Sequence, residues 1–398
     1  MKVGLNRRSL GLLAALFTIL SLLCLYSISF GTTTDRALKS EADGSIRPLS
    51  QLPEYIANTA NHDHITLSKT QWEQCLDPGA EPAYYLSIVI VTRMDDYAGN
   101  QHHRFQNFID STYILAERTK TKIELLIVEW NPPKDKRRIV DAFRFRHSQY
   151  LNHRIITVPK AIHDALPNVG NAPLHEFEGK NVGIRFARGE FIVCTNQDDI
   201  WSHNFHNAIQ SRVFEKNVIY LQHQDHHNIH AEKLPPSLVK VPIFADDDII
   251  YNACQLGDQD WGNYTLAAPM NVTTENILDI ADQAGDFTMA HRDTWKIPRG
   301  YREAGGVAWM DIEFICTATW TYGIPVVYSK PGFTCHQDHQ NIWEFIPERH
   351  NDNKDIDMGE IMRKEKVYIN KEKEWGLQQL DIWDMELECL QFRGGLVW

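Results

Sequence analysis

Short apolar segments alternate with amphipathic ones from about residue 83 onward. Apolar runs of the kind found in strands buried on both faces occupy residues 86–92, 123–129, 154–158 and 190–195. Segments with helical periodicity lie between them, at residues 105–117, 140–145 and 181–187. This alternation predicts βαβ units, and therefore an α/β fold with a mostly parallel open sheet flanked by helices.

Polar residues follow several of these predicted strands. They are Thr92 and Arg93, Glu129, and the run Asn196-Gln197-Asp198-Asp199. Ligands of open α/β sheets bind outside the carboxyl ends of the strands, so these residues are the first candidates for a site. A buried carboxylate needs a positive partner, and Mg²⁺ or Mn²⁺ meets that need with oxygen ligands. The run therefore predicts a metal site at Asn196 and Asp198, although its residue types also suit a loop that caps the next helix.

The amino terminus carries a separate apolar run. Residues 9–30 contain no charge and, as a helix, would span about 33 Å against a hydrocarbon core of about 30 Å. Lys2, Arg7 and Arg8 precede the run, which places residues 1–8 in the cytosol and the remainder across the membrane. A cleaved signal peptide is the alternative, but its apolar region is usually only about 7–15 residues long. We expect an uncleaved signal-anchor at residues 9–30.

Composition narrows the function classes. The chain has 398 residues, and 40 Lys+Arg against 52 Asp+Glu give a net charge of −12, which argues against a nucleic-acid partner. The sequence contains neither Gly-x-Gly-x-x-Gly nor Gly-x-x-x-x-Gly-Lys, so dinucleotide-binding and P-loop functions lose their usual support. Six of the seven cysteines follow the apolar run and permit disulfides, but the sequence does not choose a pairing. Glycosylation sequons at Asn263 and Asn271 suit a luminal location.

Residues 180–201 resemble a signature of family-2 glycosyltransferases of the GT-A fold. In that signature an Arg/Lys-Asn-x-Gly helix precedes Ala-x-Gly-Glu-Tyr/Phe, a strand and an Asp-x-Asp metal motif. This chain reads Lys180-Asn-Val-Gly, then Ala187-Arg-Gly-Glu-Phe, then Asn196-Gln-Asp-Asp-Ile-Trp201. Asn196 stands where the family has its first acid, while Asp198 and Asp199 match the acids that follow. Asparagine still offers a carbonyl oxygen to a metal.

Residues 285–313 resemble the acceptor half of the same family. There a Gly-Phe-x-Glu turn precedes a Glu-Asp-x-Asp/Glu helix start whose Asp is the catalytic base. The base falls on Asp311, with Met310 replacing the acid before it. The alternative is that Asp311 and Glu313 are ordinary acids of a first helical turn. Since positions i and i+2 do not share a helix face, we expect one of them to face the cleft, and the motif register favours Asp311.

The resemblance also implies roles for other residues. Donor contacts fall on Thr92, Arg93, Glu129, Asn181, Asn196 and Asp198. Metal ligands are Asp198, Asn196 and a late histidine, His336 or His339, which follows the apolar strand 325–328; a histidine at the edge of the core is the alternative. Asp199, Trp201, Trp309 and Glu313 are candidates to contact the acceptor or to support the residues that do. The resemblance implies Mn²⁺ or Mg²⁺ as the cofactor.

Together these features predict a single-pass type II membrane glycosyltransferase of the Golgi or ER with a luminal catalytic domain. It would transfer one sugar from a nucleotide sugar, with a uridine nucleotide the first choice, to a glycan, glycoprotein or glycolipid, with inversion. A retaining GT-A enzyme and an inactive carbohydrate-binding protein, suggested by Asn196 and Met310, are the alternatives. The Gln-x-x-Arg-Trp motif of processive synthases is absent.

The expected domain organisation has five parts. They are a cytosolic tail at 1–8, the anchor at 9–30, a stem at 31–82, the catalytic domain at 83–345 and a carboxyl-terminal extension at 346–398. The extension is expected to be helical, with one apolar stripe formed by Leu380, Trp383, Leu387 and Leu390.

Overall fold

A computed structural model describes most of the chain after residue 68. The described residues are 69–166, 172–222, 238–256, 269–281, 284–303, 309–329, 332–339, 358–363 and 368–393. The expected anchor, most of the stem and the sequon at Asn263 lie outside these ranges. Among the described residues, none of the helices has the length and apolar character needed to cross a bilayer.

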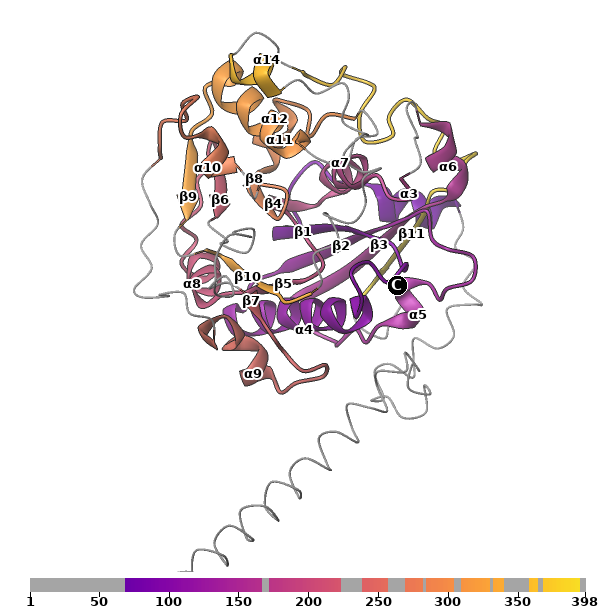
Figure 1. The fold of residues 1–398 in the computed structure, drawn as a ribbon. Coiled ribbons are helices and arrows are strands. Elements are labelled where there is room, and N and C mark those ends of the chain that lie inside the picture. The colour runs from indigo at the N-terminus through magenta and orange to yellow at the C-terminus, as the bar shows by residue number, and fades with distance from the viewer. Residues whose placement is uncertain are drawn as a thin grey trace, which may run out of the picture. The chain divides into compact units, whose positions relative to one another are not determined.

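An eight-stranded sheet in the order β11-β3-β2-β1-β4-β8-β6-β9 is the centre of the fold (Figure 1). Its strands are β1 Tyr84–Thr92, β2 Ile123–Trp130, β3 Leu151–Val158, β4 Gly189–Thr195, β6 Ile219–Gln222, β8 Phe287–His291, β9 Val326–Ser329 and β11 Glu388–Phe392. Strands β3, β2, β1 and β4 are parallel, whereas β8 runs antiparallel between β4 and β6. The predicted α/β fold with a mostly parallel open sheet is confirmed.

The apolar runs are explained by burial on both faces of the sheet. Along β1, Val89 and Val91 pack into one hydrophobic cluster, and Ile88 and Ile90 pack into another. Successive side chains of a strand point to opposite faces, so a continuous apolar run serves both clusters. Helix α4 (Gln101–Thr119) lies on one face, and α7 (Glu176–Phe186), α11 (Arg292–Lys296) and α12 (Met310–Cys316) lie on the other (Figure 1).

Helix α7 lies very close to β1. A Cβ atom on Gly183 would be 2.2 Å from Cγ1 of Val89, and one on Gly179 would be 2.5 Å from Cγ1 of Val91. Only glycine fits at these two positions, because any side chain would push the helix off the sheet. The close approach at Gly179 and Gly183 therefore holds Lys180 and Asn181 over the strand.

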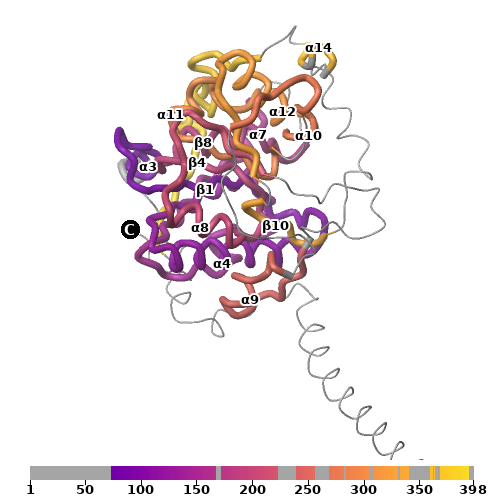
Figure 2. Tube along the Cα trace, turned by 90° about the vertical axis from the view of Figure 1, so that its left-hand side faces the viewer, coloured from indigo at the N-terminus to yellow at the C-terminus, as the bar shows by residue number. Residues whose placement is uncertain are grey.

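The other helices are short. They are α3 Lys69–Leu76, α5 Ile139–Ala142, α6 Lys160–Ala165, α8 His203–Ser211, α9 Asp247–Tyr251, α10 Ile277–Ala281 and α14 Met358–Met362, with a 3₁₀ turn η3 Ala253–Leu256 and a π-helical turn η4 Thr317–Thr321. Figure 2 shows α9 beside α4, where Asp248 forms an ion pair with Arg118.

A second, three-stranded sheet has the order β5-β10-β7, formed by Asp199–Trp201, Thr334–Gln337 and Leu238–Val239. Strand β10 pairs antiparallel with β5 and brings His336 opposite Asp199. A disulfide between Cys254 and Cys335 joins η3 to β10. This small sheet carries distant residues to the carboxyl end of β4.

The prediction of a helix around residues 380–390 is wrong. Residues Glu388–Phe392 form β11, which pairs antiparallel with β3 at the edge of the main sheet. Cys389 forms a disulfide with Cys75, and Leu387 and Phe392 have no exposed surface. Pairing with β3 and the disulfide outweigh the local helical pattern, because tertiary contacts override weak propensities. The segment thus completes the main sheet.

Candidate metal and catalytic site

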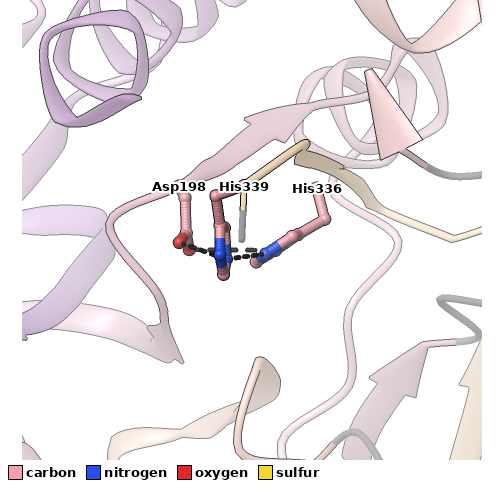
Figure 3. A group of neighbouring side chains, drawn as sticks. All are labelled: Asp198, His336 and His339. Carbon is pink, nitrogen blue, oxygen red and sulfur yellow. Dashed lines mark hydrogen bonds and ion pairs between the residues drawn. The ribbon is translucent and has the colours of Figure 1, made fainter. Parts of the chain in front are cut away.

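Three side chains that can bind a metal meet at the carboxyl end of β4 (Figure 3). Asp198 lies between β4 and β5, His336 lies on β10, and His339 follows that strand. One ligand atom from each lies within 4.8 Å of the others. Nε2 of His336 is 2.9 Å from Nε2 of His339, which is 3.3 Å from Oδ2 of Asp198. The structure thus brings both candidate histidines to the predicted aspartate.

The environment of Asp198 favours its ionised form. Arg104 of α4, itself buried, forms an ion pair with Oδ2 of Asp198. Although burial acts in the opposite direction, His336, His339 and Arg104 hold the pKa of Asp198 below its usual range. Burial lowers the pKa of His336, but Asp198 and Asp199 outweigh it and raise the pKa to about 9.

The donor set fits a divalent transition metal. It offers one carboxylate and two imidazoles, and imidazole nitrogens suit transition ions better than Mg²⁺, which prefers oxygen ligands. Of the two expected ions, Mn²⁺ therefore fits these residues better. Asp199 supports the set, because its Oδ1 is 3.4 Å from Nδ1 of His336 while Thr195 Oγ1 donates to its Oδ2 at 2.6 Å.

The loop before β8 connects this group with Asp311. The side-chain amide of Asn196 donates to Oδ1 of Asp286, and the backbone N–H of Gly285 donates to Oδ2 of Asp311 at 2.8 Å. Lys180 donates from Nζ to the Gly285 carbonyl at 2.6 Å, and its Nζ is 3.4 Å from Oδ1 of Asn196. One short loop, fixed by a fully buried lysine, therefore holds both halves of the candidate site.

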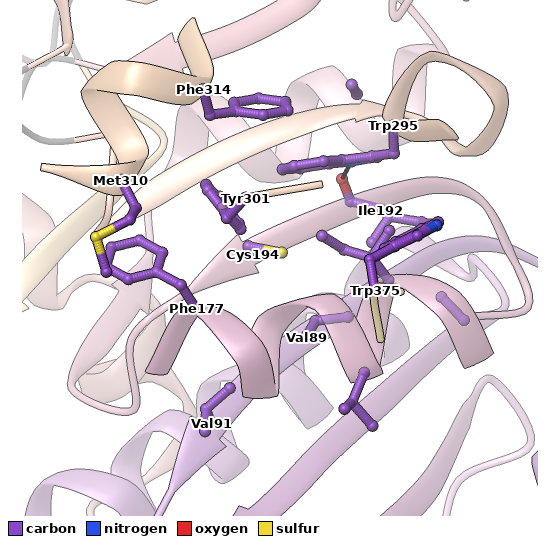
Figure 4. Packing of buried hydrophobic residues seen from close by; sticks show 14 of the residues in the cluster. Val89, Val91, Phe177, Ile192, Cys194, Trp295, Tyr301, Met310, Phe314 and Trp375 are labelled. Atoms are coloured by element: carbon purple, nitrogen blue, oxygen red, sulfur yellow. Dashed lines mark hydrogen bonds between the residues drawn. The ribbon is translucent and has the colours of Figure 1, made fainter. Parts of the chain in front are cut away.

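Asp311 lies in the first turn of α12 and is half-buried. Burial raises its pKa to about 6, although backbone N–H groups and Lys180 act against the rise. A carboxylate with a pKa near neutrality is well suited to accept a proton. Met310, which replaces an acid of the family motif, has no exposed surface and points into a hydrophobic cluster with Phe177 and Phe314 (Figure 4).

The two acids of α12 have different surroundings, as their spacing predicts. Glu313 is 2% exposed, and its Oε1 is 3.3 Å from Nη1 of Arg302. Asp311 instead meets the loop that carries Gly285. Trp309, just before the helix, is 43% exposed and has a φ of 71°. A left-handed tryptophan is strained, and such strain is concentrated at functional positions.

Four of the predicted donor residues divide into two groups. Thr92 is 1% exposed and shares hydrogen bonds with Gln101 and with Gln197, the neighbour of Asp198, whereas Arg93 donates from Nε to the Asn131 carbonyl at 2.8 Å. These residues lie at the edge where a ligand is expected.

Glu129 and Asn181 instead hold the fold together. Glu129 is 1% exposed and accepts from Arg138 Nε at 2.7 Å and from the Ile139 N–H at 2.8 Å. Asn181 is fully buried and hydrogen-bonds the backbone of Tyr301 through both ends of its amide, at 2.7 and 2.8 Å. These hydrogen bonds engage the carboxylate of Glu129 and the side-chain amide of Asn181. The predicted contacts of the two residues with the donor stay predictions.

Trp201 has no exposed surface; its ring stacks on Phe205 with centroids 4.7 Å apart, so it supports the site from within the core. Sequence reasoning missed Arg104 and Asp286. Arg104 directly precedes the amphipathic segment 105–117, and no local pattern indicates its pairing with Asp198.

No family model matches the chain, and no curated protein matches it. Solved structures similar to it include S. aureus TarS 1–349, with 13% identity, a TM-score of 0.40, and coverage of 70% of each chain. Another is the catalytic domain of Drosophila β1,4-galactosyltransferase 7 in complex with xylobiose, with 12% identity, a TM-score of 0.35, and coverage of 72% of this chain and 83% of that one. A third is GalNAc-T7 with UDP, GalNAc and Mn²⁺, with 8% identity, a TM-score of 0.36, and coverage of 65% and 44%. At 13% identity or less, no ligand or reaction transfers to this chain.

Proposed function

We propose that this chain is a metal-dependent glycosyltransferase of the GT-A type. It transfers a single sugar from a nucleotide sugar, with a uridine nucleotide the first choice, to a hydroxyl group of a glycan, glycoprotein or glycolipid. One observation carries the proposal: Asp198, His336 and His339 meet at the carboxyl end of β4, and the loop containing Gly285 and Asp286 links this end to Asp311. The resemblance of residues 180–201 and 285–313 to family-2 enzymes supports it independently.

Asp198, His336 and His339 would hold the metal, with Asp199 orienting the ring of His336. When bound, a divalent cation supplies positive charge to the diphosphate that leaves the donor. Thr92 and Arg93, at the end of β1, would contact the nucleotide, as the family resemblance implies.

Asp311 acts as the general base of the proposed reaction. With a pKa of about 6 it is mostly ionised at neutral pH. Its carboxylate takes the proton of the acceptor hydroxyl while the hydroxyl oxygen bonds to the anomeric carbon. The bond between that carbon and the phosphate oxygen breaks, and its electron pair leaves with the nucleoside diphosphate. Attack from the opposite face inverts the anomeric configuration.

We propose a luminal location in the Golgi or ER, with a single membrane anchor at residues 9–30. Two disulfides, Cys75–Cys389 and Cys254–Cys335, support an oxidising compartment. The sequon residue Asn271 is exposed and accessible to glycosylation. Treatment of the expressed full-length chain with an endoglycosidase should increase its mobility; a chain that stays unglycosylated in an intact secretory pathway argues against this location.

A screen of nucleotide sugars tests the function. The purified full-length chain is incubated with each donor, with Mn²⁺ or with EDTA, and the released nucleoside diphosphate is measured. We expect Mn²⁺-dependent release from one donor, and faster release when a matching acceptor is present. Absence of turnover with every donor supports the inactive carbohydrate-binding alternative. Where a product forms, NMR of its anomeric proton distinguishes inversion from the retaining alternative.

A further inference from the structure

A cavity lies at the edge of the main sheet where the parallel strands begin, opposite the edge that carries the metal group. Its volume is about 530 Å³, and Tyr84 at the start of β1 is part of its lining. The candidate donor residue Thr92 lies at the other end of this nine-residue strand, about 27 Å away along the extended chain. The cavity is therefore separate from the metal group and from Asp311.

The cavity is positively charged although the chain is acidic. Four cations from two connecting segments line it: Lys120 and Lys122 between α4 and β2, and Arg212 and Lys216 between α8 and β6. Two carboxylates, Glu81 and Glu190, also line it, which leaves a net charge of +2 in a chain whose net charge is −12. Convergence of cations from distant parts of the chain attracts an anion.

The cations differ in how they are engaged. Lys120 is paired with Glu117 at 3.0 Å, whereas Lys122 and Lys216 form no ion pair with any carboxylate of the described residues. These two ammonium groups remain available to an anionic ligand. Lysine ammonium groups bind phosphate as point charges and need no fixed fork geometry.

One of these cations covers the ring of Tyr85. The guanidinium of Arg212 lies over this ring, 3.6 Å from its centroid, whereas Tyr84, the preceding residue of β1, directs its side chain to the opposite face of the sheet. Arg212 has a φ of 54°, at a helix end where glycine is usual. Its backbone therefore adopts a left-handed conformation that is unfavourable for arginine, and its guanidinium packs on the ring of Tyr85 in the cavity wall.

We propose that this cavity binds a phosphate or sulfate ester of a small molecule. The lysines meet the ester anion, and the volume is within the usual range of about 300–1,000 Å³ for small-molecule sites. This inference does not depend on the proposed transferase activity.

Calorimetric titration of the full-length chain with glucose 6-phosphate and glucose 6-sulfate tests the proposal. EDTA is present, so that a metal at Asp198 does not bind the ester. We expect both esters to bind, and the double variant Lys122→Gln/Lys216→Gln to weaken binding at least about tenfold. The control Lys296→Gln/Lys373→Gln removes two exposed lysines outside the cavity and should bind like the wild type. Glu81→Gln removes an exposed lining carboxylate and should tighten binding severalfold.

Three results would overturn the proposal. The first is equal ester affinity in the wild type and the cavity double variant. The second is binding of uncharged glucose as tightly as its esters. The third is binding of inorganic phosphate as tightly as the esters, which would reduce the cavity to an unspecific anion site. None of these readouts depends on turnover, so they are independent of the donor screen.

Discussion

Two buried groups of charges lie at opposite ends of the main sheet, and they are built differently. At the start of β2 and β3, Glu124 and Arg154 are both fully buried, with Oε1 and Nε 3.2 Å apart. Ser87 Oγ donates to Glu124 at 2.6 Å, and Arg154 donates to the Cys75 carbonyl at 2.8 Å. Each charge meets an opposite charge and backbone partners, as a buried ion pair that serves the fold must.

The group at the carboxyl ends of the strands has a different composition. Asp198 meets Arg104 and His339, while His336 lies between Asp198 and Asp199 at 3.7 and 3.4 Å. The two histidines direct Nε2 atoms at one another, 2.9 Å apart. Ligand atoms that converge in this way are better suited to bind a cation than to stabilise one another.

The comparison separates charges that hold strands from charges that hold a ligand. Removing a member of the first group should cost stability and leave chemistry unchanged in the molecules that still fold. Removing a member of the second should cost chemistry before stability.

Asp198→Asn should reduce the rate of sugar transfer at least about a thousandfold, because it removes the one carboxylate of the metal group. Asparagine keeps an oxygen that can accept from Arg104, so the variant should fold, whereas alanine would leave a buried arginine without its partner. Steady-state rates and thermal unfolding check both statements. The matched variant Glu124→Gln should lower the free energy of unfolding by about 3–5 kcal/mol and keep the rate per folded molecule.

Asp311→Asn should slow transfer by about 10²–10⁴-fold with little change in nucleotide affinity, since it removes only the proton acceptor. Glu313→Gln is the control from the same helix; it weakens the contact with Arg302 and should affect stability more than rate. Single-turnover kinetics and nucleotide titration separate the two. If Glu313→Gln is the slower variant, the base is two residues further along the helix.

The transfer rate should fall about tenfold per pH unit below pH 6 and level off above pH 7. Burial raises the pKa of Asp311 to about 6, and a general base acts only when it has lost its proton, so activity is lost as the pH falls through that value. A pH profile at saturating Mn²⁺ measures the inflection. The residual activity of Asp311→Asn should lack it; the same inflection in that variant assigns the titration to another group.

One disulfide lies next to the metal group and the other at the edge strand β11. Cys335 precedes His336, so Cys254→Ser/Cys335→Ser should weaken Mn²⁺ binding severalfold by loosening β10. Cys75→Ser/Cys389→Ser acts at β11 and should lower the free energy of unfolding by about 2–5 kcal/mol without changing Mn²⁺ affinity. Calorimetry of metal binding and thermal unfolding, applied to both variants, distinguishes them. Equal Mn²⁺ affinities in the two variants contradict the predicted link between the first disulfide and the metal.

The sequence predicted the parts of the site that depend on local pattern. The apolar strand at 190–195 and the polar run after it placed Asp198 at the carboxyl edge of the sheet, because ligand-binding positions in such sheets follow from chain direction. The spacing of Asp311 and Glu313 likewise anticipated their divergence on one helix turn.

Local sequence patterns did not predict the contacts between segments that are far apart in the chain. The contact of Arg104 with Asp198, and the pairing of β10 with β5 that delivers His336, join segments far apart in the chain. The sequence pattern predicts a helix where β11 forms, because its apolar residues suit either period and only pairing with β3 selects the strand. Such contacts depend on the assembled sheet.

Titration of Mn²⁺ into the purified full-length chain, followed by electron paramagnetic resonance of the free ion, shows whether these residues bind the metal. The wild type should bind Mn²⁺ at the group formed by Asp198, His336 and His339. Asp198→Asn and His336→Ala should each weaken this binding at least about tenfold, since each removes one ligand, while Glu124→Gln at the opposite edge should bind like the wild type. Equal Mn²⁺ affinity in all four proteins would contradict the assignment of the metal site.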